Sequence, residues 1–245
     1  MNTFIHGNNT SDIRLVAALG AMGIKCDEKG AGGALQSRNG IVRTWNLSAT
    51  SNCGLWKLGE LMKWWRDKEF HVTNPAHPFN RVKAAMASNK AFSEALSRHM
   101  GIGTVRRGSS LMAAVMDSPV ITAKNTLSHP TDDFRKAAAF LAMGFDVTEL
   151  PPQGSHRLVQ IANTAWTGCE FAPLEIAWND NRYHETNPQH AFSYVKAAIW
   201  NYNYLVNAIK NDKPLVDISR GESFAYLHPD CSAETERQIL SQFDK

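Results

Sequence analysis

The sequence is short of the features by which several protein classes are recognised. It has four cysteines in 245 residues and no Cys-x-x-Cys pair, which argues against a disulfide scaffold or a zinc knot and favours reduced thiols. No apolar run approaches the roughly 20 residues that a membrane-spanning helix needs. The N-terminal residues lack the charged and apolar regions of a secretory signal. We therefore expect a cytoplasmic protein.

Charge of one sign and catalytic signatures are equally scarce. The 26 Lys and Arg residues nearly balance the 23 Asp and Glu residues, and the net charge of +3 is small beside that of many DNA-binding domains. The sequence contains no P-loop, no Gly-x-Ser-x-Gly elbow, no His-Glu-x-x-His motif and no deaminase pair of His-x-Glu with Pro-Cys-x-x-Cys. These absences exclude the common hydrolase, zinc-protease and deaminase classes, and we predict neither a cofactor nor a bound metal.

What the sequence does have is an internal repeat. Residues 65–85 and 178–198 align without a gap at an offset of 113, and 12 of the 21 positions are identical. Unrelated windows of this length would share about one residue. Residues 10–23 and 131–144 align at an offset of 121, with eight identities in 14 positions. We interpret these matches as a tandem duplication.

The duplication predicts the domain organisation. We expect one copy over residues 1–118 and a second over 119–245, the latter extended by a C-terminal helix. Each copy of about 115 residues is large enough to bury its own core. Its pattern predicts an α+β unit in the order helix, strand, helix, helix, strand. Two similar units in one chain pack most simply about a pseudo-two-fold axis, as homodimers do.

Local signals predict the elements of each copy. Thr10 and Thr131 are candidate N-caps of the first helix, and Gly23 and Gly144 are its stop signals. The other expected elements are strands at 41–45 and 158–162, helices at 54–66 and 168–179, short strands at 103–107, 110–115, 215–219 and 222–227, and a helix at 232–243.

The long helix of each copy is expected to begin at a proline. Asn74 and Asn187 are placed as N-caps, with Pro75 and Pro188 at the first helical position. Lys83 and Lys196 follow about two turns later on these helices. A lone lysine on a helix usually lies in solvent, and we expect both to do so.

The most specific chemical motif lies where these long helices begin. It reads Asp67-x3-His71-x-Thr73-Asn74-Pro75-x-His77, and it recurs as Asp180-x3-His184-x-Thr186-Asn187-Pro188-x-His190. Free backbone N–H groups and the positive end of the helix dipole favour an anion at such a place. An imidazole with a pKa near 6.5 can donate to phosphate as a neutral or a charged group. Two such sites could hold two phosphates of one ligand.

A second repeated unit could assist this binding. Arg107 and Arg220 each begin an Arg-Gly-x-Ser sequence, and a guanidinium can bind phosphate through two parallel hydrogen bonds. We predict a non-enzymatic binding protein for a nucleotide, a cyclic dinucleotide or a nucleic-acid segment, with its oligomeric state open. The predicted ligand-binding residues are His71, Thr73, His77, Arg107, His184, Thr186, His190 and Arg220.

An enzymatic alternative rests on two tripeptides within the motif. His71-Val-Thr73 and His184-Glu-Thr186 give one His-x-Thr to each copy. This pair resembles the two-histidine phosphoesterases, whose two lobes each contribute one His-x-Thr. The resemblance implies a hydrolase in which one histidine acts as base, the other as acid, and the threonine hydroxyls hold the phosphate.

Other interpretations of the same residues stay open. The motif could serve only to start the helix, with Asn74 as cap and His77 turned back toward it. Each copy also contains a two-histidine, one-carboxylate set of the kind that binds metals, formed by Asp67, His71 and His77 and by Asp180, His184 and His190. A third possibility is a protein–protein interaction module, in which the motif histidines contribute to stability alone.

Overall fold

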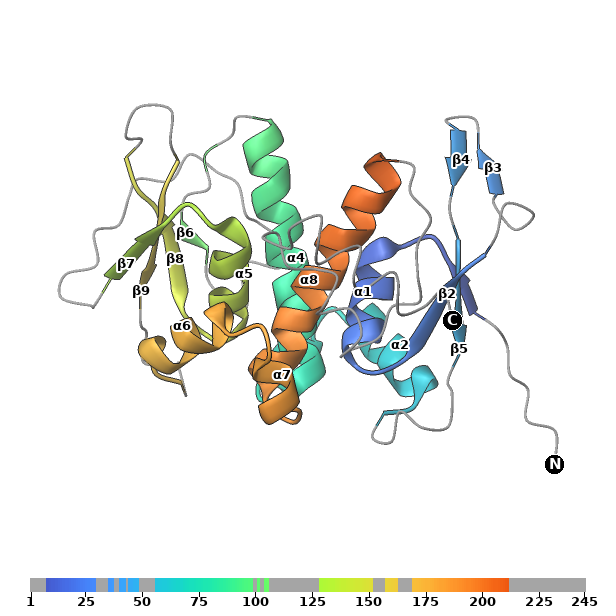
Figure 1. Ribbon diagram of the computed structural model, residues 1–245, viewed down its shortest axis with the longest axis horizontal. Coiled ribbons are helices and arrows are strands. Elements are labelled where there is room, and N and C mark those ends of the chain that lie inside the picture. The colour runs from blue at the N-terminus through green and yellow to red at the C-terminus, as the bar shows by residue number, and fades with distance from the viewer. Residues whose placement is uncertain are drawn as a thin grey trace. The chain divides into compact units, whose positions relative to one another are not determined.

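The structure is a computed structural model that combines helices with small antiparallel sheets, an α+β fold (Figure 1). It describes residues 8–29, 35–37, 40–42, 44–48, 56–98, 101, 104–105, 128–151, 157–162 and 169–211. The chain divides into two compact units, one formed by Lys68–Ile199 and the other by Met1–Asp67 together with Trp200–Lys245. This division differs from the predicted copies, whose shared boundary near residue 118 lies outside the described residues.

The unit built from both chain ends contains a three-stranded sheet and a buried helix. Its elements are β1 (Asn8–Thr10), α1 (Ile13–Ala21), β2 (Lys25–Glu28), β3 (Leu35–Ser37), β4 (Gly40–Val42), β5 (Trp45–Ser48), α2 (Leu58–Arg66) and the C-terminal half of α8 (Ala191–Lys210). β5 pairs antiparallel with β1 and β2, and β3 pairs with β4. Because side chains alternate along a strand, Trp45 and Leu47 share one face of β5, and both are buried.

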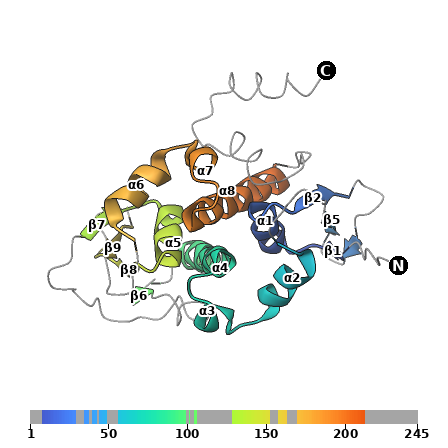
Figure 2. The same ribbon diagram turned by 90° about the horizontal axis from the view of Figure 1, so that it is seen from below.

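The unit formed by one continuous segment, Lys68–Ile199, is called the continuous unit here, and it contains a four-stranded sheet and most of the helices. Its elements are α3 (Phe70–Thr73), α4 (Pro78–Ser97), β6 (Thr104–Val105), β7 (Ser128–Thr131), α5 (Phe134–Ala142), β8 (Asp146–Glu149), β9 (Val159–Ala162), α6 (Phe171–Asn179), α7 (Tyr183–Thr186) and the start of α8. The antiparallel sheet has the order β6–β8–β9–β7. Helix α5 lies between this sheet and α4, as both ribbon views show (Figures 1 and 2).

Small and aromatic side chains form the core of the continuous unit. Ala137, Ala138 and Ala139 of α5 are fully buried, and small side chains let helices approach closely. The Phe140 ring lies 4.9 Å from that of Phe171 and 6.0 Å from that of Phe192, between ring centroids. These contacts join α5 to α6 and α8, the helices on either side of the second copy of the motif.

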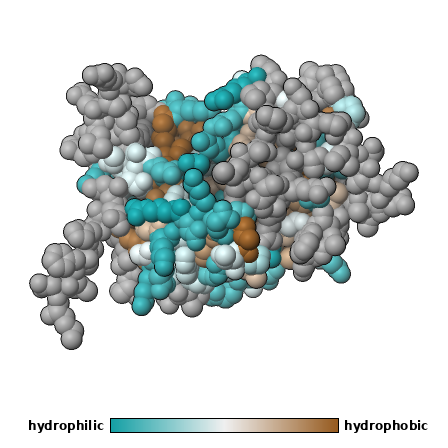
Figure 3. Space-filling view, turned by 180° about the vertical axis from the view of Figure 1, so that it is seen from behind, coloured by the Kyte–Doolittle hydropathy of each residue, from teal (hydrophilic) through white to brown (hydrophobic). Residues whose placement is uncertain are grey.

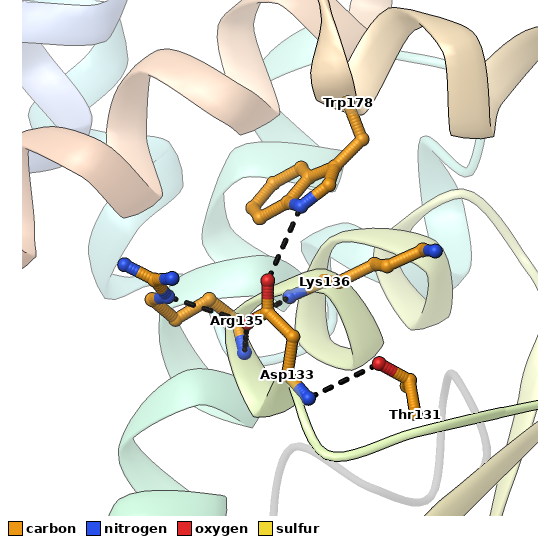
Figure 4. Close-up of polar contacts among 5 residues, drawn as sticks. All are labelled: Thr131, Asp133, Arg135, Lys136 and Trp178. Carbon is orange, nitrogen blue, oxygen red and sulfur yellow. Dashed lines mark hydrogen bonds and ion pairs between the residues drawn. The ribbon is translucent and has the colours of Figure 1, made fainter. Parts of the chain in front are cut away.

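The first helix of each half is capped by an aspartate, and the predicted threonine caps are wrong by two residues. Asp12 accepts hydrogen bonds from the backbone N–H groups of the residues two and three positions later, and Asp133 does the same. Thr10 and Thr131 instead accept from the backbone N–H of these aspartates. Asp133 also accepts from the indole N–H of Trp178 at 3.3 Å (Figure 4).

The glycines predicted to end the first helices do follow them, whereas the long helices begin later than predicted. Gly23 and Gly144 follow α1 and α5 with φ of 90° and 105°, a left-handed conformation that glycine adopts readily. The long helices begin at Pro78 and Ala191, three residues later than expected. In each half a four-residue helix ends immediately before the Asn-Pro pair, and a turn separates that pair from the long helix.

The remaining predicted elements are only partly described. β9 matches the expected strand at 158–162, and β6 covers two residues of the expected strand at 103–107. The expected strand at 41–45 is divided between β4 and β5. The expected strands at 110–115, 215–219 and 222–227 and the helix at 232–243 lie outside the described residues.

Matching elements recur in the two halves of the sequence. The helices α1 and α5 have nine residues each, α2 and α6 nine, α3 and α7 four, and α4 and α8 twenty. The long helix of the first half, α4, packs on α5 of the second half. In the other unit Asn201 of α8 donates its Nδ2 hydrogen to the Ala17 carbonyl of α1 at 3.5 Å. Each long helix therefore contacts the first helix of the other half.

Candidate functional site

The threonines and asparagines of the motif close the short helices α3 and α7. The Nδ2 group of Asn74 donates to Thr73 Oγ1 at 2.8 Å, and that of Asn187 donates to Thr186 Oγ1 at 2.8 Å. Each threonine hydroxyl in turn donates to a backbone carbonyl of its own short helix or of the residue before it, at 3.3 Å. Although Thr73 and Thr186 are exposed, their hydroxyl hydrogens are engaged in local structure.

His77 and His190 stand immediately before the two long helices and cap them. His77 Nδ1 accepts a hydrogen bond from the backbone N–H of Phe79 at 3.1 Å, and His190 Nδ1 accepts from that of Phe192 at 3.2 Å. A ring nitrogen accepts only when it carries no proton, so a neutral imidazole in this position carries its hydrogen on Nε2. One first-turn N–H group in each helix is therefore satisfied by an imidazole, where we expected it to meet an anion.

Burial favours the neutral form of both capping imidazoles. It lowers the pKa of His77 below 6.5, and it is the largest cause of the same shift in His190. The nearby positive charge of Arg81 lowers the pKa of His190 further. Burial of the His190 ring is partial, because the residue as a whole is exposed, and a molecule in solution can therefore reach it.

The other two motif histidines lie within the short helices. His184 of α7 is only 8% exposed, whereas His71 of α3 is half-buried. The sequence expectation placed both at the surface of an anion site, and the burial of His184 limits what a ligand can reach there. Arg107 and Arg220 lie outside the described residues.

Lys196 corrects the expectation that the helical lysines lie in solvent. It is 1% exposed, and its Nζ donates to the carbonyl oxygens of Ala177 at 2.9 Å and Asp180 at 2.7 Å. These carbonyls end helix α6, so the lysine caps that helix at the negative end of its dipole. Burial lowers the pKa of Lys196 to about 8, opposed by the Asp180 carboxylate. Lys83, its counterpart, is half-buried.

Sequence reasoning missed Arg81 of α4, a partly buried cation whose charge is only partly compensated among the described residues. Its Nη1 donates to the Ala142 carbonyl at 3.5 Å and contacts the Met143 sulfur at 3.8 Å, while its Nε is buried without a hydrogen-bond partner. Burial lowers the pKa of this guanidinium. Among the described residues, no carboxylate forms an ion pair with it.

Three chemically active side chains lie in the same unit as Arg81 and are linked to it by charge or ring interactions, and together the four form what we call the Arg81 cluster. Arg81 interacts electrostatically with His190 and with the half-buried thiol of Cys169. The edge of the Tyr183 ring meets the His190 imidazole, with centroids 5.8 Å apart. Burial, followed by the charges of Cys169 and Asp180, raises the pKa of Tyr183. The cluster brings together a guanidinium, an imidazole, a phenol and a thiol.

Metal binding by the motif finds no support in the described residues. Within them, no group of three or more His, Cys, Asp or Glu side chains is arranged to hold a metal ion. Asp67, His71 and His77 therefore do not form the two-histidine, one-carboxylate set considered from their spacing.

In the part of the chain that the structure describes, no helix is long and apolar enough to span a bilayer.

Comparisons with known proteins give no assignment for this fold or site. No protein-family model, no curated protein sequence and no solved structure matches the chain.

Proposed function

We propose that the chain is a binding protein for a small molecule that carries a phosphate group, and that the phosphate binds at the Arg81 cluster. The observation that carries this proposal is the state of Arg81, a half-buried guanidinium with a buried, unpartnered Nε and no carboxylate partner among the described residues. Removing a charge from water costs free energy unless an opposite charge or hydrogen bonds replace the solvent. A bound phosphate would provide both.

His190 provides a second donor for the same anion. Because its Nδ1 accepts from the Phe192 N–H, the hydrogen of the neutral ring lies on Nε2. Arg81 disfavours protonation of this imidazole. A phosphate near both groups would accept a hydrogen bond from a fixed neutral tautomer and from a permanent cation, and hydrogen bonds to charged groups are the stronger kind.

We further propose that the two halves share a common origin and that they no longer bind alike. The offset of 113 aligns Arg81 with Tyr194, so the second half has no arginine at this position. Tyr194 instead donates its hydroxyl hydrogen to Gln189 Oε1 at 3.1 Å. We therefore expect one strong anion site in the continuous unit, in place of two equivalent half-sites about a pseudo-two-fold axis.

The two alternative functions receive less support. A two-histidine phosphoesterase needs threonine hydroxyls that can hold phosphate, but those of Thr73 and Thr186 donate to backbone carbonyls. A protein-interaction module needs a continuous apolar face. Large exposed apolar side chains among the described residues are scattered over three helices, at Val72, Ile176 and Ile209, and the face in Figure 3 is mainly hydrophilic where its elements are coloured.

The proposal is tested by calorimetric titration with inorganic phosphate, pyrophosphate and a nucleoside monophosphate. Since a hydrogen bond to a charged group contributes about 1.5–3 kcal/mol, Arg81→Gln should weaken binding by at least about ten-fold. Arg182→Gln is the matched control, because Arg182 is exposed and paired with Glu185. Circular dichroism verifies that each variant is folded. Absence of binding by the wild type, or equal affinity in Arg81→Gln, would contradict the proposal.

A further inference from the structure

We propose that the outer face of helix α2 binds single-stranded nucleic acid. This face, called the α2 surface here, comprises Gly59, Lys63, Trp64 and Arg66, together with Trp56 and Lys57 immediately before the helix. It belongs to the unit built from both chain ends. The inference goes beyond the proposed function, because the Arg81 cluster lies in the continuous unit and neither proposal depends on the other.

Exposed cations lie along one side of the α2 surface. Gly59, Lys63 and Arg66 are exposed, and their spacing of four and three residues places them next to one another along the helix. Lys57, the N-cap, is exposed as well. Among the described residues, no carboxylate forms an ion pair with Lys57, Lys63 or Arg66. Phosphate groups could therefore neutralise these charges.

The carboxylates of this segment do not cancel the positive charge. Glu60 is exposed and is the acidic residue within α2. Asp67 follows the helix and is offset by Lys68 after it. Residues 57–68 therefore have an excess of two positive charges. Such an excess favours a weak, salt-dependent attraction of a polyanion.

Two tryptophans lie beside these cations. Trp56 precedes the helix, Trp64 follows Lys63 directly, and both tryptophans are half-buried. Their rings meet edge to face, with centroids 6.3 Å apart and ring planes at 73°. This arrangement covers one face of one ring, so aromatic faces remain on which a base could stack. Aromatic rings beside basic side chains are typical of surfaces that bind single strands, whose bases are free to stack on protein.

Gly59 leaves open space on the α2 surface. A Cβ added at this position would meet no heavy atom within 4 Å. Packing therefore does not require glycine here, and glycine is a poor helix former. A residue without a side chain lets another backbone come close. Beside Lys63 and Arg66, this opening suits a sugar–phosphate backbone.

The corresponding helix of the second half lacks this surface. Helix α6 also has nine residues, and the offset of 113 aligns it with α2. The positions of Gly59, Lys63, Trp64 and Arg66 are taken there by Ala172, Ile176, Ala177 and Asn179. The same kind of helix thus forms without the glycine, the two cations and the tryptophan, so helix formation alone does not account for these residues in α2.

Fluorescence anisotropy with a labelled oligothymidylate of about 12 nucleotides tests the charge contribution. The wild type should bind with a dissociation constant of about 1–100 µM, as is usual for contacts without sequence specificity. The double variant Lys63→Gln/Arg66→Gln loses two phosphate contacts, so the slope of log affinity against log salt concentration should become shallower by about 1.4. The matched control is Lys90→Gln/Arg182→Gln, which removes two cations that are paired with glutamates and should leave the slope unchanged.

Stacking is tested separately at Trp64. Because the stacking of one base on an aromatic ring is a substantial part of such binding, Trp64→Leu should weaken the affinity about five-fold or more while the salt slope stays the same. Trp64→Phe keeps an aromatic ring and should retain most of the affinity. Circular dichroism verifies that each variant is folded, and a purely structural Trp64 would alter the melting temperature without this pattern of affinities.

Four results would overturn the inference. The first is a wild type that does not bind the oligothymidylate, and the second is an equal change of salt slope in the two double variants. The third is a Trp64→Leu variant with the affinity of the wild type, or a duplex of the same length that binds as tightly as the single strand. The fourth is polyglutamate that competes as well as the oligothymidylate, since the surface would then attract any polyanion.

Discussion

Lys196 and Arg81 are both cations on the long helices, but they differ in how far the surrounding protein satisfies their hydrogen-bond donors. Lys196 is fully occupied by the carbonyl oxygens at the end of α6. Arg81 has a buried nitrogen without a partner. Helical periodicity could not tell these cases apart, because the burial of a long polar side chain depends on which end of another helix lies beside it. Comparison of the two halves did not single out Arg81, because it aligns with Tyr194 and is therefore not one of the shared residues.

The buried amine of Lys196 predicts a distinct dependence of stability on pH. Its folded pKa of about 8 lies below the ordinary 10.5, so between these values the unfolded chain keeps a proton that the folded chain releases. Rising pH then favours the folded state. From pH 7.5 to 9.5 the free energy of unfolding of the wild type should increase relative to Lys196→Met by about 1–2 kcal/mol. Urea denaturation at both pH values measures the difference, and a constant difference would contradict the assigned shift.

At the scale of the element, the sequence indicated which segments become helices better than where they begin. Thr10 and Asp12 are both good N-cap residues, and only the backbone geometry decides between them. Asn74 followed by Pro75 is an ordinary helix start, yet it ends a short helix here because Phe70 is buried and holds α3 against the core. Local preference was overridden by tertiary packing in this case.

Asp133 should contribute more to stability than an ordinary N-cap. Its carboxylate accepts from two backbone N–H groups of α5 and from the Trp178 indole, which is 6% exposed. Asp133→Ala should lower the free energy of unfolding by about 2–3 kcal/mol, from loss of the cap and an unsatisfied indole N–H. Asp133→Asn keeps the oxygen that caps α5 but places an amide NH2 group opposite the indole, so it should cost less than Asp133→Ala while still losing the indole hydrogen bond. Equal losses in the two variants, measured by urea denaturation, would show that the hydrogen bonds are not the cause.

The histidine caps of α4 and α8 predict acid sensitivity. The pKa values of His77 and His190 are lowered in the folded state, so the stability they support is complete above pH 6.5 and is lost as the pH falls below it. Protonation of Nδ1 also removes the acceptor for the Phe79 and Phe192 N–H groups. The double variant His77→Asn/His190→Asn retains capping side chains that do not titrate. Its melting temperature should fall less between pH 7.5 and 5.5 than that of the wild type, and an equal fall would argue against these caps.

At the scale of the whole molecule, a repeat predicts which elements recur but leaves open which of them pack together. The apolar pattern of a helix shows that one face will be buried, but it does not show whether the partner belongs to the same half of the sequence or to the other half. The contact of α4 with α5, and the hydrogen bond from Asn201 of α8 to Ala17 of α1, show that the long helices pack across the halves. The compact units therefore combine segments from both halves of the sequence, and local patterns along the chain do not predict such packing.

This arrangement predicts which fragments can fold alone. Residues 68–199 contain α4, α5 and the four-stranded sheet, so this fragment should give a helical spectrum and a cooperative thermal transition. The fragment 119–245 lacks α4, which leaves the buried alanines of α5 uncovered, and we expect it to aggregate or stay unfolded. Circular dichroism of both fragments decides the matter. A folded 119–245 with an unfolded 68–199 would contradict the division into units.

The most direct test of the anion site is the NMR signal of the His190 imidazole nitrogens during a phosphate titration at constant pH. The site predicts a neutral ring with its hydrogen on Nε2, and a progressive shift of the Nε2 signal as phosphate binds. His77, which caps its helix in the same way, serves as the internal reference and should move much less. The shift should disappear in Arg81→Gln. If the His190 nitrogen chemical shifts do not change on addition of phosphate, or change no more than those of His77, the proposal that this cluster binds an anion is contradicted.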